Sequence, residues 1–306
     1  MKACIVALMN FCLNFSDLLK SKSDIFFKSY HSYFNLPYDE AVHDIRVYSR
    51  KLYVPLLFLE KLLKEKESHP YISLFREVRR KFSEYRDHEV MLFRLTGMAE
   101  TVNEEHRIFH QKLLELTAEY LEKQKHLIDE SLRNVIFPEP DHTVNVLCLK
   151  LRNFQHNHPD DYIKKILKTL KMMILKHERS VGKYHRSLKN GNIQENIHRL
   201  RIAIKKLRYL LEFCSELGVF DASKQVKKYS KLQKLLGTYC DDLMIRNHLK
   251  STAKQFRNDH NDGGFSGYCN NLSQQFGTDA LKLQRKVPGI SIAEYFIFAE
   301  YKKHRK

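Results

Sequence analysis

Apolar residues recur every three or four positions along most of this chain, which is the period of an amphipathic α-helix. The pattern is longest in residues 161–188, which we predict to form one helix, and in residues 104–132, which fit either one long helix or a helix pair. Asn192 marks another helix start, because asparagine is a good N-cap residue and Glu195 follows three positions later. These long helical stretches, rich in Leu, Lys, Glu and Ile, predict an all-α fold.

Turn-forming residues are scarce, with 10 glycines and 7 prolines in 306 residues. Pro138 and Pro140 are expected to stop a helix and to make residues 134–145 the main seam of the chain. Residues 258–271 are polar and glycine-rich, and we expect a loop there. Residues 1–15 begin with an apolar run that we interpret as the first helix of a bundle, because no clear signal-peptide cleavage site follows it. No stretch approaches the ~18 uninterrupted apolar residues that span a membrane.

The chain contains an internal repeat. "VHDIRVYSRKLYVPLLFLEKLL" (42–63) aligns with "IHRLRIAIKKLRYLLEFCSELG" (197–218), with the histidines 155 residues apart (198 minus 43). Downstream, "YRDHEVMLFRL" (85–95) aligns with "YCDDLMIRNHL" (239–249) at an offset of 154 (239 minus 85). Two motifs at nearly one offset predict two similar helical halves, about 1–137 and 138–306, packed about a pseudo-twofold axis within one domain.

The second copy of the repeat carries a row of cations. At 100° per residue, His198, Arg201, Lys205 and Arg208 fall within an arc of about 80° of one helix. The opposite side carries Leu200, Ala203, Ile204, Leu207, Leu210 and Leu211. In the first copy His43, Arg46 and Arg50 repeat the row, but Tyr53 takes the fourth place. Pro55 should also kink or restart that helix. We therefore expect the first copy to be the weaker site.

Two further groups of cations have the same one-sided character. Between residues 164 and 189 there are nine Lys or Arg residues and one acid, Glu178. Five lysines between residues 224 and 234 form the other group. Solvated helix faces usually mix Lys with Glu, because such pairs stabilise the helix. A solvated face is the plain alternative, but unpaired positive faces favour a polyanion ligand.

The overall charge supports this interpretation. The chain has 53 Lys and Arg residues against 36 Asp and Glu residues, a formal net charge of +17. Such a surplus costs self-repulsion, and nucleic acid, an anionic membrane or another polyanion are the usual partners. Phosphate oxygens would accept charge-assisted hydrogen bonds from these cations, and binding would release counterions. The six cysteines form no C-x-x-C pair, so we expect free thiols in a reducing compartment.

The paired motifs are similar to those of a known family. With "VHDIRVYSRKL" and "IHRLRIAIKKLRY", and with "FSEYRDHEVML" (82–92) and "LQKLLGTYCDD" (232–242), the chain resembles the CHAD family, the conserved-histidine α-helical domain, over about residues 15–255. The resemblance implies a single helical bundle of two pseudo-symmetric halves around a basic central channel that binds inorganic polyphosphate. It also implies a stand-alone binding module, since no E-x-E-x-K strand of a fused triphosphatase domain is present.

Our expected site combines these motifs with the flanking cationic faces. The expected polyphosphate-binding residues are His43, Arg46, Arg50, Lys51, Lys164, Lys168, Lys171, Arg179, Lys183, Arg186, His198, Arg201, Lys205, Lys206, Arg208, Lys228 and Lys231. No cofactor, metal or membrane partner is expected. Other phosphate-rich polyanions remain possible ligands, and a cytoplasmic location, including polyphosphate granules, would suit the free thiols.

Other interpretations remain open at this point. A helical nucleic-acid-binding protein would explain the same charge, although we find no RRM-like or helix-turn-helix pattern. His43 and His198 would contact phosphate, orient a neighbour or, in an enzyme, take part in phosphoryl transfer or metal-assisted hydrolysis. His106 and His110 have the i,i+4 spacing of two metal ligands, but two ligands do not make a site. No P-loop or nucleophile motif is present, so we predict binding rather than catalysis.

Overall fold

The fold is described from a computed structural model that covers residues 9–35, 39–65, 68–133, 135, 140–189, 192–259 and 262–297. Across these ranges all regular structure is helical, as predicted. The α-helices are α2 (Phe11–Asn35), α3 (Asp39–Leu63), α4 (His69–Thr96), α5 (Arg107–Arg133), α6 (Pro140–Asn157), α7 (Tyr162–Arg186), α8 (Ile193–Glu216), α9 (Ser223–Asp259) and α10 (Gly263–Lys286). Short 3-10 turns are η1 (Ala99–Thr101), η2 (Glu104–His106), η3 (Ser187–Lys189), η4 (Val287–Gly289) and η5 (Ile292–Tyr295).

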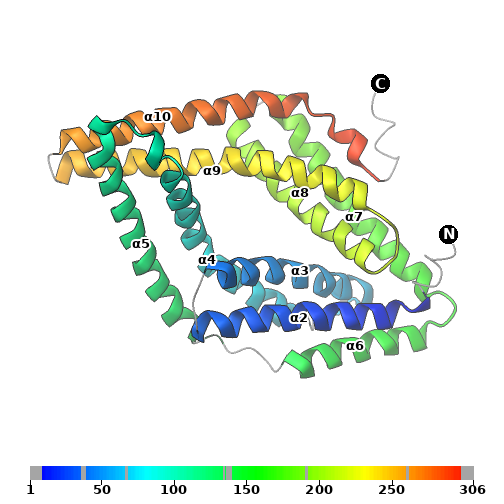
Figure 1. The fold of residues 1–306 in the computed structure, drawn as a ribbon. Coiled ribbons are helices and arrows are strands. Elements are labelled where there is room, and N and C mark those ends of the chain that lie inside the picture. Colours follow the sequence, from blue (N-terminus) through cyan, green and yellow to red (C-terminus); the bar gives the residue numbers. More distant parts are fainter. Residues whose placement is uncertain are drawn as a thin grey trace.

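The helices pack mostly against their neighbours in sequence, with a few crossings that close the bundle (Figure 1). The pairs α2–α3, α4–α5, α7–α8 and α9–α10 make the most extensive contacts, together with α8–α9 and α3–α4. Helix α3 also packs on α7 and α8, and α4 crosses from α3 to α9 (Figure 1). These crossings join helices from the two ends of the chain and place the faces of α3, α4, α7 and α8 around one region.

The main hydrophobic core draws buried residues from all of the described α-helices, and an aromatic cluster of α2, α3 and α8 forms part of it. The ring centroids of Phe15 and Phe58 lie 6.2 Å and 5.7 Å, respectively, from that of Phe213, and all three side chains are buried. At the edge of this core Lys22 pairs with Glu216 at 2.8 Å. Aromatic contacts of this kind add to the free energy of burial. The predicted apolar face of α8 is confirmed, since its Leu and Ile residues at positions 200, 204, 207, 210 and 211 are all buried.

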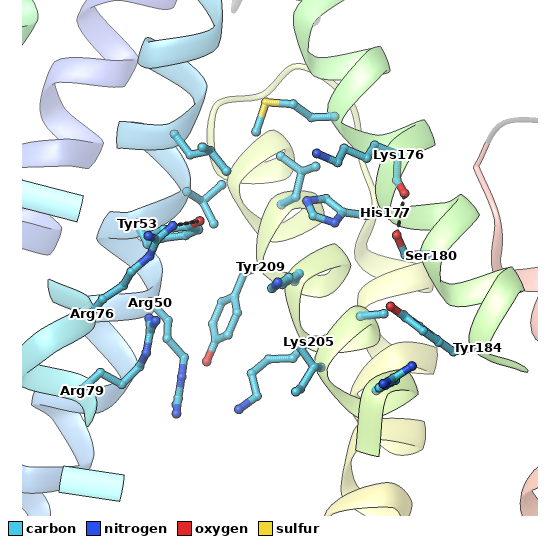
Figure 2. A pocket seen from close by; sticks show the side chains of 18 of the residues that line it. Arg50, Tyr53, Arg76, Arg79, Lys176, His177, Ser180, Tyr184, Lys205 and Tyr209 are labelled. Atoms are coloured by element: carbon cyan, nitrogen blue, oxygen red, sulfur yellow. Dashed lines mark hydrogen bonds between the residues drawn. The ribbon is translucent and has the colours of Figure 1, made fainter. Parts of the chain in front are cut away.

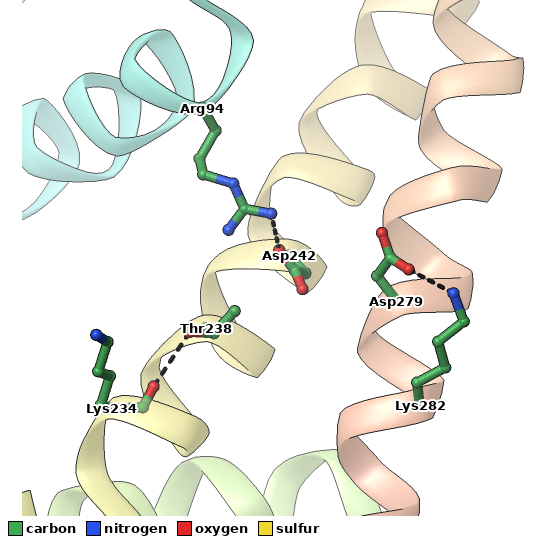
Figure 3. Close-up of polar contacts among 6 residues, drawn as sticks. All are labelled: Arg94, Lys234, Thr238, Asp242, Asp279 and Lys282. Atoms are coloured by element: carbon green, nitrogen blue, oxygen red, sulfur yellow. Dashed lines mark hydrogen bonds and ion pairs between the residues drawn. The ribbon is translucent and has the colours of Figure 1, made fainter. Parts of the chain in front are cut away.

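A second core fills the space between the end of the α9–α10 hairpin and α4 and α5. Its buried members include Met91, Leu113, Ile245 and Phe265, which come from four different helices. Nearby, Arg94 of α4 reaches the buried Asp242 of α9, with Nη2 3.0 Å from Oδ1 (Figure 3). An ion pair that is buried on one side holds its geometry because breaking it would leave an uncompensated charge. The pair therefore fixes where α4 crosses α9.

Most helix boundaries follow the sequence signals. Asn192 caps α8, and its side-chain oxygen accepts a hydrogen bond from the Glu195 amide at 3.2 Å. Residues 107–133 form one helix rather than a pair, after the short turn η2. The seam separates Arg133, the end of α5, from Pro140, the start of α6, although Pro138 lies outside the described residues. Residues 1–8 of the expected first helix also lie outside them.

Helix α3 continues through Pro55, so the expected restart does not occur. A proline inside a helix costs about 3 kcal/mol, because it removes a hydrogen bond and crowds the preceding turn. Leu52, Leu56 and Leu59 are buried in the core on either side of it. Burying such side chains is worth about 1.5–3 kcal/mol each, so packing keeps the helix continuous.

The loop expected at residues 258–271 is wrong for most of its length. Helix α9 continues to Asp259 and α10 begins at Gly263. Asp262 caps α10 by accepting a hydrogen bond from the Phe265 amide at 3.0 Å. One of the glycines serves close packing there: a Cβ at Gly264 would lie 2.9 Å from the Phe109 ring. The glycines therefore belong to the start of a helix and not to a long loop.

Two other expectations concern the chain as a whole. Among the described cysteines, Cys12, Cys148, Cys214, Cys240 and Cys269 are all free, as predicted, and Cys4 lies outside the described residues. None of the described helices combines the length and the apolar character needed to cross a membrane.

Candidate anion-binding site

A cavity of about 810 Å³ lies between α3, α4, α7 and α8. Eight of the residues that line it are Lys or Arg, and none of the described lining residues is Asp or Glu. The cations are Arg50, Lys61, Arg76, Arg79, Lys176, Arg199, Lys205 and Lys206. Arg199 pairs with Glu195 of its own helix. Because no acid is among the described lining residues, the converging guanidinium and ammonium groups still create a strongly positive potential in the cavity. The cavity is therefore suited to bind an anion with many oxygens.

Helices α3 and α4 contribute one wall of the cavity (Figure 2). Arg76 donates a hydrogen bond to the Tyr53 hydroxyl at 3.1 Å, and its guanidinium lies 5.4 Å from the centre of that ring. The Arg79 guanidinium lies 6.0 Å from the same ring. A cation over an aromatic face is held in place electrostatically. Tyr53, which breaks the cationic row of α3, therefore positions two arginines from the neighbouring helix.

Helix α8 contributes the middle of the cavity and α7 the opposite wall (Figure 2). Lys205 and Tyr209 point into the space between the walls, toward Arg50 (Figure 2). Arg50 of α3 and the Tyr209 side chain of α8 interact electrostatically across this space. From α7, Lys176 and His177 face the same space (Figure 2).

Burial first, and then repulsion among the cations, lowers the pKa of several basic groups in the cavity. The pKa of Lys205 falls to about 7, first because burial disfavours the ammonium and then because Arg50 and Arg201 lie close to it. Burial likewise lowers the pKa of Arg79. The pKa of His177 falls to about 4, mainly through burial and then through nearby lysines. An anion in the cavity would relieve this repulsion.

Two acids lie beside the cavity, where they orient arginines. Arg201 of α8 reaches Asp241 of α9, with 3.9 Å between Nη2 and Oδ1. Burial raises the pKa of both Asp87 and Asp241, and nearby arginines oppose that rise, Arg46 first for Asp87 and Arg201 first for Asp241. Arg46 also donates a hydrogen bond to the Phe82 carbonyl at 2.6 Å. Asp241 thus forms an ion pair with Arg201 from the second copy of the repeat.

A second cavity, of about 860 Å³, adjoins the first between α3 and α7. The two share Lys61, Met173, Lys176 and Ser180 as lining residues. The second cavity adds the cations Lys64 and Arg179, with Glu60 as the acid among its described lining residues. The positive lining therefore continues from the first cavity along α7.

Comparison with known proteins identifies the family. Residues 36–250 match the model of the CHAD domain. The chain belongs to the CHAD family. The crystal structure of the CHAD domain from the plant Ricinus communis has the same fold, with a TM-score of 0.59 and 16% identity over 92% of each chain. A comparison with curated proteins gave no match.

The CHAD domain brings only some of the expected residues into the two cavities. Arg50, Lys205 and Lys206 line the first cavity and Arg179 lines the second. Arg46 and Arg201 act electrostatically on Lys205, although neither is a lining residue. These residues come from α3, α7 and α8, so the paired motifs do meet in space.

The remaining expected residues lie elsewhere on this CHAD domain. Arg208 bonds Glu212 at 2.8 Å and Gln233 at 3.0 Å, and the Lys51 ammonium lies 4.7 Å from the centre of the Tyr48 ring. The Lys228 ammonium lies over Tyr295 at 5.0 Å. The other expected residues are exposed and line neither cavity: His43, Lys164, Lys168, Lys171, Lys183, Arg186, His198 and Lys231.

Five of the cations that line the first cavity were not among the expected residues: Lys61, Arg76, Arg79, Lys176 and Arg199. Arg76 and Arg79 come from "REVRRK" in α4, immediately before the "FSEYRD" motif. This group of cations on one side of the helix could have identified Arg76 and Arg79 from the sequence. Lys176 belongs to the cationic face of residues 164–189 and was visible there, but its orientation depends on how α3 packs on α7.

The structure also bears on the metal interpretations. Both ring nitrogens of the buried His110 are occupied, Nδ1 by the Tyr268 hydroxyl at 2.6 Å and Nε2 by the Leu95 carbonyl at 3.0 Å. His110 therefore has a structural role in the second core. Across the described residues, no three His, Cys, Asp or Glu side chains are grouped so that they could hold a metal ion.

Proposed function

We propose that this CHAD domain binds inorganic polyphosphate, with Arg50, Arg79 and Lys205 as central contacts. The observation that carries the proposal is the first cavity, in which eight cations and no described acid converge. Arginine offers forked donors to phosphate oxygens and lysine a mobile charge. A chain of phosphates supplies negative charge along its whole length, and the second cavity extends the cationic lining in one direction. The role is binding rather than catalysis.

The lining favours polyphosphate over nucleic acid. Single-stranded nucleic acids bind proteins largely through bases stacked on aromatic side chains. The tyrosines of the first cavity already carry cations: Arg76 lies over Tyr53 at 5.4 Å, and Arg208 lies over Tyr209 at 4.5 Å. Lys183 lies 5.9 Å from the centre of the Tyr184 ring. A base would have to compete with these cations for the three rings.

Calorimetric titration with long-chain polyphosphate, tRNA and duplex DNA at two salt concentrations tests the proposal. We expect polyphosphate to bind more tightly than either nucleic acid, with an affinity that falls as salt rises. Equal or tighter binding of tRNA or DNA would overturn it. Incubation with radiolabelled polyphosphate tests the enzymatic alternative, because shortening of the chains would show hydrolysis.

A pair of charge-reversal variants localises the binding. Arg79→Glu should weaken polyphosphate binding by roughly ten- to a hundredfold, since one charge-assisted hydrogen bond contributes about 1.5–3 kcal/mol. Lys250→Glu is the matched control, because Lys250 is exposed on α9, does not line either cavity, and changes the net charge equally. Similar losses in both variants would mean that net charge, and not the cavity, drives binding.

A further inference from the structure

Lys205 has an environment that polyphosphate binding does not by itself require. Its side chain is largely buried on α8 and projects into the first cavity, toward Arg50 (Figure 2). Among the described residues it makes no hydrogen bond or ion pair. Asp87 and Asp241, which lie beside the cavity, interact with arginines. The amine is thus accessible from the cavity and is not held by a carboxylate.

The charged groups that act most strongly on Lys205 are cations. Arg50 and Arg46 approach from α3, Arg79 from α4, and Arg201 from its own helix. Together with burial they bring the pKa of Lys205 to about 7, so a large share of the amine is uncharged at neutral pH. Guanidinium groups keep their charge at that pH, and the pKa of Arg46 is still about 10. The cavity therefore combines a neutral amine with fixed positive charges.

This combination has a known chemical consequence. A lysine that is desolvated or placed beside other cations becomes a nucleophile toward carbonyl groups. The surrounding arginines would hold a phosphate group of the same molecule, which turns a bimolecular encounter into a positioned one. A volume of about 810 Å³ is ample for a small phosphorylated molecule.

We propose that Lys205 is a covalent modification site for small aldehydes that carry a phosphate group. The neutral Nζ attacks the carbonyl carbon, the resulting carbinolamine loses one water molecule, and an imine joins Nζ to that carbon. No oxidant or reductant is needed, and the step is reversible. The bound phosphate contacts Arg50 and Arg79. This inference uses the same cavity as the proposed function but does not depend on polyphosphate being the ligand.

Lys206 provides an internal comparison. It is the next residue on α8, lines the same cavity, and is exposed where Lys205 is not. A reagent that simply prefers accessible amines would modify Lys206 and the exposed lysines of α7 first. A reagent that is guided by the arginines to a neutral amine would modify Lys205 first.

Pyridoxal 5′-phosphate is the probe for this test. The full chain is incubated briefly with about one equivalent of probe at pH 7.5, the imine is reduced with borohydride, and the labelled peptides are quantified by mass spectrometry. We expect the label mainly on Lys205 and at least tenfold less with pyridoxal, which has the aldehyde but lacks the phosphate. Labelling spread over Lys206 and surface lysines according to exposure, or equal labelling by pyridoxal, would overturn the proposal.

Two variants serve as controls for the labelling experiment. Lys205→Arg keeps the charge and should remove the dominant label without exposing a new one. Arg50→Gln removes a neighbouring cation, so the pH of half-maximal labelling of Lys205 should rise; an unchanged profile would contradict the role of the arginines. Circular dichroism of each variant checks that the helices persist.

Competition separates this proposal from the proposed function. If polyphosphate occupies the cavity, an excess of it should suppress labelling of Lys205. Selective labelling that polyphosphate does not suppress would support the modification site and count against polyphosphate binding in the cavity. Tight polyphosphate binding without preferential labelling of Lys205 would support the proposed function and count against the modification site.

Discussion

The surroundings and the position of a side chain in the cavity depend on its neighbours more than on its residue type. Lys205 and Lys206 are adjacent lysines on one helix, but one is crowded by four arginines and the other is exposed. Tyr53 stands where the second copy of the repeat has Arg208, and it contacts Arg76 and Arg79 from α4. The positive charge lost from α3 is therefore recovered from the adjoining helix.

Polyphosphate affinity should depend on pH through Lys205. In the free domain its pKa is about 7, and phosphates in the cavity would raise it. Below pH 7 the amine is charged in both the free and the polyphosphate-bound domain, so the affinity is at its maximum. As the pH rises through 7 the free domain loses the proton, binding must take it back, and the affinity should fall by up to about tenfold per pH unit.

Titrations between pH 6 and 9 at constant ionic strength measure this dependence. Repeating them in buffers with different ionisation enthalpies should show proton uptake near pH 7.5. The Lys205→Arg variant is the control, since its guanidinium stays charged and its affinity should change little over this range. A wild-type affinity that stays flat from pH 6 to 9 would contradict the role given to Lys205.

The same residues show what the sequence could predict about the site. Helical periodicity correctly separates the cationic and apolar faces of α8, because both follow from one period. Periodicity alone cannot choose among the cations of one face. Arg208 lies on the predicted row, but Glu212, one turn later, and Gln233 of α9 take its hydrogen bonds. Arg79 lies outside the repeat motifs, and only the packing of α4 brings it to the cavity.

At the scale of helices, the start of α10 shows where composition misleads. Residues 258–271 are rich in Gly, Asn and Asp, which usually indicates a loop. Instead, Asp262 caps the helix, and Gly264 allows α10 to approach Phe109 of α5. The long helices α7 and α8 were predictable because their apolar period is regular over many turns. A helix that begins with glycines is visible only when its packing partner is known.

Substitutions at two glycines of α10 test this packing. In Gly264→Ala the new Cβ would lie 2.9 Å from the Phe109 ring, and forcing the ring aside should cost about 1–3 kcal/mol. In Gly267→Ala nothing lies within 4 Å of the new Cβ, so the helix should gain about 0.5–1 kcal/mol from reduced backbone entropy. Urea unfolding curves should therefore shift in opposite directions. Equal stabilisation of both variants would show that the contact with Phe109 does not constrain α10.

At the scale of the whole molecule, the internal repeat does not mean two independent units. Phe15 and Phe58 from before the seam pack on Phe213 from after it. The second core likewise combines Met91 and Leu113 with Ile245 and Phe265. Cavity walls from α3 and α4 face those from α7 and α8. Both cores and the candidate site thus draw on residues from both sides of residue 137.

Separating the chain at the seam should therefore abolish folding of each part. Fragments 1–137 and 138–306, expressed alone, would each expose half of both cores, and each exposed core side chain would forfeit about 1.5–3 kcal/mol of burial. We expect each fragment to melt without a cooperative transition by circular dichroism, and the mixed fragments to recover one. If the mixture binds polyphosphate and neither isolated fragment does, the cavity forms only when both halves meet. A sharp transition in either isolated fragment would mean instead that this half folds as a domain by itself.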